Sequence, residues 1–523
     1  MESSGAMFVI GLPRVSRMGS DRGVWQNRWL TVAALGLVSA CGALMATQYA
    51  VPVLAATLGA FLLGISLANW RVSYLILLAY LPYSGVAAII LYPNTGNAAL
   101  LKDVALVLPA YFGFIAYLVR TKRPLNPTGV STWFLVPLAA IVLAQAFNPS
   151  LPNMLVPLVG IRVWLLYMPL VYLTAHFVWF EERGLETILR VLVISSLPAA
   201  VLGLLQALLL DVGLDKLAYA PYGQAAVAVT QGFAAFEIGT GTVRRAVSTL
   251  PYTGEYFQFT LCAIAASYAL WRLPRPHHQP SRFALVTLCV SIVAACTSGL
   301  REAFFVVPAL LVIAALFEGL RFNRFAGQGV LVVGALAAAT ASFGVSAAAL
   351  LDNLAGVAAT EAQFLLIDGL GRGLPFAIIG LGTGADTNAT RYVLDGQLVV
   401  NTFGNVWFED WYLKTLVELG IVGLMAVAVL IIGVVRLARL ALGGGALNSG
   451  PGNDRIRSVA APLAAFLLLV LLLNIKGAAV DLDPINVEFW VVLGMLLAWV
   501  PANRVRNESG DLSRSTMDPS HAV

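Results

Sequence analysis

The sequence predicts an all-α integral membrane protein, because its composition is too apolar for a soluble chain and its apolar residues gather in long runs. Of the 523 residues, 59% are hydrophobic and 11% are charged, whereas a soluble globular protein carries about 25% charged residues. The 11 Trp and 16 Tyr residues suit a protein with two membrane–water interfaces to anchor. A soluble globular chain is therefore excluded.

Apolar runs of the length that crosses a bilayer, about 20 residues, recur along the whole chain. They predict about 14 transmembrane helices, within a range of about 12 to 14. The expected spans are 29–46, 49–68, 72–91, 101–120, 131–147, 155–179, 187–210, 253–272, 283–299, 302–319, 329–350, 411–437, 458–474 and 486–501.

Basic residues between these runs predict that both termini are cytoplasmic. Lys and Arg fall in alternate loops, beginning with an Arg-rich N-terminus and ending with Arg504 and Arg506, which is the positive-inside pattern. The net charge of +5 thus reports topology and not nucleic-acid binding. We expect a cytoplasmic N-terminus, a single polytopic membrane domain with two long outer loops, and a cytoplasmic tail. These segments are 1–28, 29–501 with loops at about 211–252 and 351–410, and 502–523.

A second group of charges does not follow this topology, because it lies within helices or at their predicted outer ends. A charge at membrane depth costs several kcal/mol and usually faces a cavity or a partner. The group could pair locally to hold helices together, but its convergence on one face from separate segments favours a functional cavity. Its members include Lys102, Arg162, Arg244, Arg245, Glu255, Arg301, Glu409 and Asp410.

A cavity that mixes arginines with carboxylates suits glycosyl transfer from a lipid-linked sugar. Guanidinium groups bind phosphate in a bidentate manner and stabilise a departing diphosphate. A carboxylate accepts the proton of the attacking hydroxyl. The four His and four Cys residues show no metal-ligand spacing, so we expect neither a metal nor another cofactor.

Five short segments on this face carry a resemblance to a known family. They are 245–252 (RAVSTLPY), 297–303 (TSGLREA), 380–384 (GLGTG), 409–414 (EDWYLK) and 418–424 (ELGIVGL). In order, spacing and sidedness they resemble motifs of the bacterial O-antigen ligase and Wzy-type O-antigen (exopolysaccharide) polymerase superfamily. The resemblance covers about residues 150–430 and departs from the family pattern before Arg301.

The resemblance implies a GT-C-like glycosyltransferase bundle in a bacterial inner membrane, working at the periplasmic face on an undecaprenyl-diphosphate-linked donor. It implies that Arg245 and Arg301 bind the diphosphate and that Glu409 stands where the ligase has histidine. That replacement favours a polymerase over a ligase, and Glu418 is interpreted as structural. We expect Arg162, Arg244, Glu255, Asp410 and Lys102 to bind substrate. Expected partners are the donor, a glycan acceptor, membrane lipids and candidate assembly proteins such as a chain-length regulator, with no nucleic acid.

Two alternatives remain at this point. An O-antigen ligase would transfer the glycan to lipid A core or another acceptor. A transporter or flippase of an anionic or lipid-linked substrate would also need buried charges. Against transport, the two halves of the sequence show no repeat, and the charges lie at one face instead of the midplane.

Overall fold

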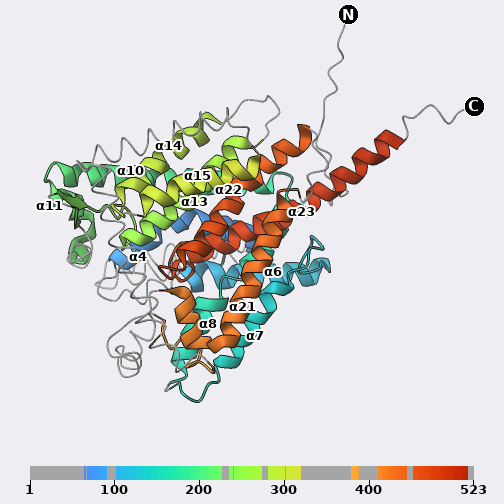
Figure 1. Cartoon of the computed structure of the whole chain (residues 1–523), viewed down its shortest axis with the longest axis horizontal. Coiled ribbons are helices and arrows are strands. Elements are labelled where there is room, and N and C mark those ends of the chain that lie inside the picture. Colours follow the sequence, from blue (N-terminus) through green and yellow to red (C-terminus); the bar gives the residue numbers. More distant parts are fainter. Residues whose placement is uncertain are drawn as a thin grey trace, which may run out of the picture. The chain divides into compact units, whose positions relative to one another are not determined.

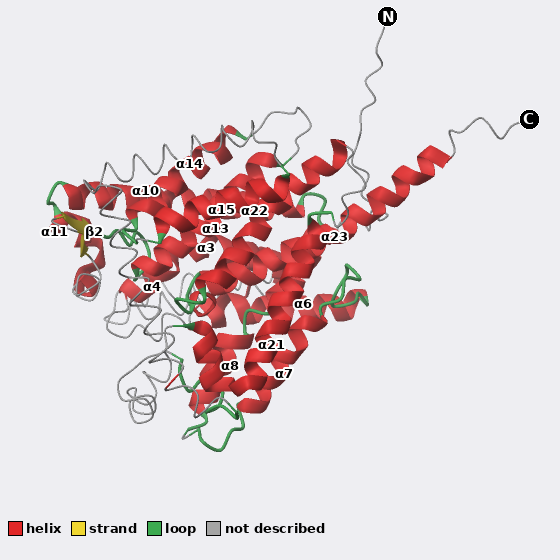
Figure 2. Ribbon diagram, in the orientation of Figure 1, coloured by secondary structure: helices red, strands yellow, loops and turns green. Residues whose placement is uncertain are grey.

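The computed structural model is helical over most of the residues it describes (Figure 2). Five of the described helical segments are long and apolar enough to cross a membrane, and they mark the chain as a multi-pass membrane protein. They are Trp70–Ile90, Asp103–Thr121, Leu155–Phe180, Gly184–Asp211 and Trp411–Ala441. The described residues are 64, 65, 68–90, 100, 102–151, 153–226, 235–238, 241–273, 281–300, 302–319, 371, 378–387, 410–443 and 451–515, with backbone alone for 224, 225, 235–238, 241–244, 451–456 and 501–515.

The chain divides into two compact units, of which the smaller comprises 1–74 and 103–120. Within it, the Trp70 ring packs edge-on against Phe114, with the ring centroids 5.0 Å apart. The Ser73 hydroxyl donates to the backbone oxygen of Leu106 at 3.0 Å. That oxygen belongs to a π-helical turn, η3 (Asp103–Val107), which precedes α6 (Leu108–Thr121).

The larger unit comprises 75–102 and 121–523. Its first span combines the end of α3 (Trp70–Tyr80), η2 (Leu81–Tyr83) and α4 (Ser84–Ile90). Its other helices are η4 (Trp133–Leu135), α7 (Val136–Gln145), α8 (Leu155–Leu165), α9 (Leu170–Phe180), α10 (Gly184–Asp211), α11 (Asp215–Tyr219), η5 (Ala220–Ala225), α13 (Thr253–Arg272), α14 (Arg282–Thr297), α15 (Ala303–Glu318), α21 (Trp411–Ala441), α22 (Pro451–Leu473), η8 (Ala479–Asp481) and α23 (Ile485–Ser515).

Small residues allow the central helices of this unit to pack closely. Helix α13 lies beside α14 and α22, and α22 lies beside α15 (Figure 1). Alanines recur on the buried positions of both α13 and α22, among them Ala263, Ala266, Ala461 and Ala465. Such side chains let membrane helices approach closely where lipid supplies no hydrophobic drive for association. Helix α23 contacts α9, α21, α22 and α13.

The helices follow the predicted apolar runs, with three differences. The expected span 155–179 is interrupted between α8 and α9, and α23 continues past residue 501 to Ser515. The segment 211–252, expected to form an outer loop, contains α11, η5 and an unexpected antiparallel hairpin of β1 (Ala235–Ile238) and β2 (Gly241–Arg244). The expected spans 29–46 and 329–350, most of 49–68 and most of the loop 351–410 lie outside the described residues.

Candidate functional site

The short loop between α22 and α23 (474–484) connects three distant segments through ion pairs. Each pair links a side chain of the loop to a charged residue at the start of another helix or at a turn between two helices. Because the partners come from widely separated parts of the sequence, the α22–α23 loop is the centre of the candidate site. The pairs are Lys476 with Glu302 (2.5 Å), Asp481 with Lys414, and Asp483 with Lys102.

The first turn of α21 carries Lys414 and Trp411 to the Trp164 ring of α8. Lys414 Nζ lies 5.3 Å from the centroid of the Trp164 ring, within cation–π range. The Trp164 and Trp411 rings lie 5.4 Å apart, and the Trp411 indole nitrogen donates to Asp481 at 3.2 Å. Asp481 therefore holds both the lysine and the tryptophan of this turn.

Asp410 is the N-cap of α21. Its carboxylate accepts hydrogen bonds from the backbone nitrogens of Tyr412 (2.7 Å) and Leu413 (2.9 Å), which satisfies two of the free donors at the helix start. Burial raises the pKa of Asp410 to about 6, although these two hydrogen bonds act in the opposite direction. Asp410 thus has a structural role as the N-cap of α21, and its substrate-binding role stays a prediction.

A glycine-rich segment (378–387, here the glycine strap) crosses α21 where that helix is broken. Gly420 has φ 71° and ψ −169° inside the helix, a conformation that favours glycine. The strap supplies the hydrogen bonds that the break leaves open, since Leu381 N donates to Val417 O (2.8 Å) and Gly382 N to Glu418 O (2.9 Å). The backbone of a membrane helix must find partners inside the protein, and here the strap provides them.

The buried Glu418 carboxylate fixes the far end of the strap. It accepts hydrogen bonds from Trp164 Nε1 (2.8 Å), Gly384 N (3.1 Å) and Asp386 N (2.9 Å). A Cβ on Gly160 of α8 would lie 2.5 Å from Gly384 N, so strap and helix meet backbone to backbone. These contacts support the interpretation of Glu418 as structural.

Three predicted substrate-binding residues meet at the other end of the α22–α23 loop. Lys102 Nζ, paired with Asp483, lies 4.9 Å from the centroid of the Tyr167 ring. The Tyr167 hydroxyl accepts from Arg162 Nη2 at 3.5 Å, a long hydrogen bond. Glu255, in the first turn of α13, lies within electrostatic range of both Lys102 and Asp483. The structure thus brings Lys102, Arg162 and Glu255 together around Tyr167 and Asp483.

The segment after β2 carries Arg245 to the turn that precedes Arg301. Ala246 N donates to Thr297 O at 3.2 Å. The Gln206 side chain accepts from the backbone nitrogens of Val247 and Ser248, each at 2.9 Å. The segment is therefore tied both to α10 and to the end of α14. Arg245 is half-buried.

Three predicted residues cannot be placed in the same way. Arg301 and Glu409 lie outside the described residues, and Arg244 is described by its backbone on β2 alone. Their roles remain predictions.

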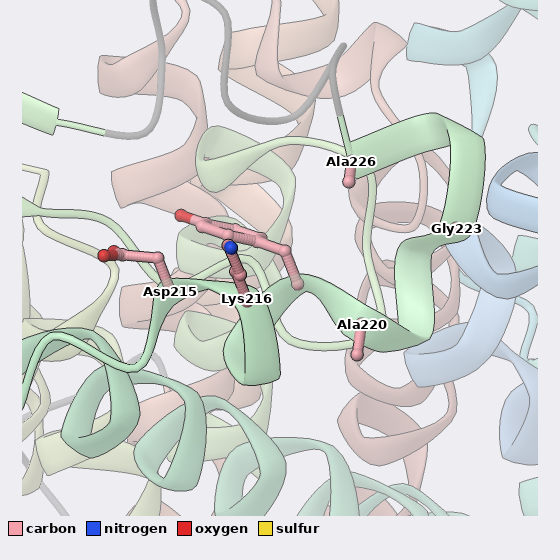
Figure 3. A pocket seen from close by; sticks show the side chains of 6 residues that line it. Asp215, Lys216, Ala220, Gly223 and Ala226 are labelled. Carbon is pink, nitrogen blue, oxygen red and sulfur yellow. The ribbon is translucent and has the colours of Figure 1, made fainter.

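An open pocket lies apart from these charges, in the first outer segment. It is lined by Asp215, Lys216, Tyr219, Ala220, Gly223 and Ala226 (Figure 3). None of these residues was among those singled out from the sequence, and none takes part in the ion pairs of the α22–α23 loop.

Sequence reasoning missed the partners of the predicted cations. Asp481 and Asp483 stand two residues apart in a loop between apolar runs, the sequence VDLDP at 480–484. Two carboxylates in so short a loop, in a chain with lysines at the ends of other predicted helices, were the available signal. Trp164 and Tyr167 were missed because aromatic residues in a membrane helix are ordinarily packing residues.

The assembled residues offer cations, carboxylates and aromatic faces at helix ends. Among the described residues, no three His, Cys, Asp or Glu side chains group as a metal site would require. No protein-family model matches the chain, and no curated protein matches its sequence.

Proposed function

We propose that the protein is a metal-independent inverting glycosyltransferase that polymerises undecaprenyl-diphosphate-linked oligosaccharide repeat units into O-antigen or exopolysaccharide. It would work at the periplasmic face of a bacterial inner membrane, with about 14 spans and both termini cytoplasmic. The observation that carries the proposal is the meeting of Lys102, Arg162 and Glu255 around the α22–α23 loop. These residues come from segments far apart in the sequence, and the charge pattern assigns Lys102 and Glu255 to the outer ends of their helices.

The proposed step needs a base, an anion site and a lateral opening for lipid. The acceptor hydroxyl attacks the anomeric carbon of the donor, its proton passes to Glu409, and the bond from that carbon to the diphosphate oxygen breaks. Polyprenyl diphosphate leaves with the bonding electron pair, stabilised by Arg245 and Arg301. The tether between Ala246 N and Thr297 O supports this pairing, because it joins the two segments that carry these arginines.

The other predicted residues would bind the substrate around this step. Lys102 and Arg162 would supply the cations that face its diphosphate. Membrane lipids surround the site, and a polysaccharide chain-length regulator or other assembly proteins are candidate partners.

Purified protein with synthetic polyprenyl-diphosphate-linked repeat units tests the proposal directly. We expect a ladder of products that forms in EDTA and is lost in Arg301→Ala and in Glu409→Gln. Glu186→Gln serves as a matched control, because Glu186 pairs with Arg190 on the surface away from the site. A single product that appears only when lipid A core is added would establish a ligase instead.

A transporter or flippase of an anionic or lipid-linked substrate is the second candidate. The break of α21 at Gly420 favours it, because discontinuous helices form the substrate sites of many transporters. Proteoliposomes that move the lipid-linked donor across the bilayer, without forming any new glycosidic bond, would establish this function and overturn the first.

A further inference from the structure

Two buried carboxyl groups beside the α22–α23 loop belong to none of its ion pairs. Glu488 lies in the first turn of α23 and is 2% exposed, and Glu255 lies in the first turn of α13 and is 8% exposed. The Cys262 thiol hydrogen-bonds the Glu488 carboxyl. The second oxygen of that carboxyl, Oε2, is buried and has no hydrogen-bond partner among the described residues.

The charges around these two groups do not balance if every carboxyl is ionised. Asp483 lies within electrostatic range of both Glu255 and Glu488, and Lys102 is the cation that faces Glu255. Among the described residues, these three carboxyl groups share one ammonium group, which is already paired with Asp483, while the Arg162 guanidinium donates to the Tyr167 hydroxyl. Two uncompensated negative charges would remain in a largely buried site.

Other charged groups against α23 do not supply the missing cation. On α21, Lys414 is paired with Asp481. On α9, the His176 ring nitrogen Nε2 lies 2.8 Å from the backbone oxygen of Pro124. The N-terminus of α23 favours an anion, but this effect is worth about 0.3–1 kcal/mol and reaches about 2 kcal/mol in partly buried sites.

The desolvation cost decides between the ionised and neutral forms of Glu488. Burying an unpaired carboxylate costs several kcal/mol even after relaxation of the surroundings, which exceeds the contribution of the helix N-terminus. A neutral acid avoids this cost and leaves a single oxygen without a partner, a penalty of about 1–3 kcal/mol. Buried ionisable groups without a partner characteristically respond by becoming neutral.

We propose that Glu255, Asp483 and Glu488 form a proton-binding site at the start of α13 and α23, in which Glu488 holds the proton at neutral pH. Its ligand is the proton itself. The Lys102–Asp483 ion pair connects this site to the α22–α23 loop, so proton occupancy and the position of that loop are coupled. The inference does not rest on the proposed function, because proton occupancy is measured without any substrate.

Infrared difference spectroscopy of the purified protein at pH 7 tests the assignment. The spectrum of the wild type minus that of Glu488→Gln should show a carboxylic-acid C=O band above the amide bands, shifted to lower frequency in D2O. Carboxylate bands at lower frequency, with no acid C=O band in the difference, would overturn the proposal. So would an acid band that is lost in Glu255→Gln and kept in Glu488→Gln.

Dicyclohexylcarbodiimide provides a second reading on the wild-type chain, which removes any dependence on the folding of a variant. This apolar reagent adds to an un-ionised carboxyl group, and the proton of that group moves to a nitrogen of the reagent. The adduct then rearranges to a stable N-acylurea, which retains all atoms of both reactants. Mass spectrometry should find the adduct on the peptide that contains Glu488. Glu186, which forms an ion pair with Arg190, is the internal control that should stay unmodified. An adduct at Glu186 with Glu488 unmodified would contradict the proposal.

Discussion

The ammonium group of Lys414 and the carboxylate of Asp481 form a buried ion pair across 67 residues of sequence. The pair joins the first turn of α21 to the α22–α23 loop, and the side chains of both residues are almost fully buried. The ion pair matters for stability mainly because either charge alone would be costly to bury here, and less because of the Coulomb attraction between the two groups.

Asp481→Asn should therefore destabilise the protein by about 3–5 kcal/mol, because it leaves Lys414 buried and uncompensated. The double variant Lys414→Met/Asp481→Leu should recover most of this loss, since it removes both charges together. Thermal unfolding in detergent measures both. Glu186→Gln, which breaks an exposed i,i+4 pair with Arg190, should cost no more than about 0.5 kcal/mol. Equal losses in all three proteins would contradict the assignment.

Gly160→Ala should destabilise the junction between α8 and the glycine strap. The new Cβ would lie 2.5 Å from Gly384 N and 2.6 Å from Gly384 Cα, and backbone atoms cannot move aside as a flexible side chain can. We expect a loss of about 1–3 kcal/mol, the usual range for overpacking. Gly254→Ala is the matched control, because nothing lies within 4 Å of its added Cβ. That variant should be neutral or slightly stabilising.

Glu418→Gln should loosen the glycine strap without removing side-chain volume. The glutamine offers one acceptor oxygen in place of two, and its NH2 group faces donors on Trp164, Gly384 and Asp386. An unsatisfied buried donor costs about 1–3 kcal/mol. Limited proteolysis should then cut the chain faster near residues 378–387 than in the wild type. Unchanged cleavage there, with cleavage unchanged elsewhere, would show that the carboxylate does not hold the strap.

The stability of the protein should depend on Asp410 between about pH 4 and pH 6. Burial raises the pKa of Asp410 from 3.8 to about 6, so the folded protein binds this proton more tightly than the unfolded chain does. The resulting stabilisation is fully present below pH 3.8 and is lost as the pH rises through about 6. Asp410→Asn keeps the cap and should remove this component. Melting temperatures of the wild type and of Asp410→Asn are measured across this pH range. The melting temperature of the wild type minus that of the variant should fall as the pH rises from about 4 to 6.

Helices that follow from apolar runs could be predicted closely from the sequence. The expected span 253–272 coincides with α13, and 187–210 lies within α10, because long stretches dominated by apolar residues favour helices in such a chain. The hairpin of β1 and β2 could not be predicted in the same way. Its strands have four residues each, too few for a period of two to stand out from the loop around them.

Three residues that the structure brings together could be singled out from the sequence, but their partners could not. Lys102, Arg162 and Glu255 stood out because charges are rare in membrane helices. Their contacts with Tyr167 and Asp483 depend on how helices far apart in sequence pack, which local patterns do not encode. The broken helix at Gly420 was hidden for a related reason, because the strap that stabilises the break lies more than 30 residues upstream.

The ion pairs of the α22–α23 loop also bear on how the chain is assembled in the membrane. Asp483 is synthesised 381 residues after its partner Lys102, which at about 5–20 residues per second is a delay of about 20 to 80 s. Throughout that interval the Lys102 ammonium group must remain in water, or with a temporary partner, since burying it alone is costly. Burial of Lys102 in its ion pair therefore waits until nearly the whole protein has been translated, and truncation before residue 481 would release two lysines, Lys102 and Lys414, from their carboxylates at once.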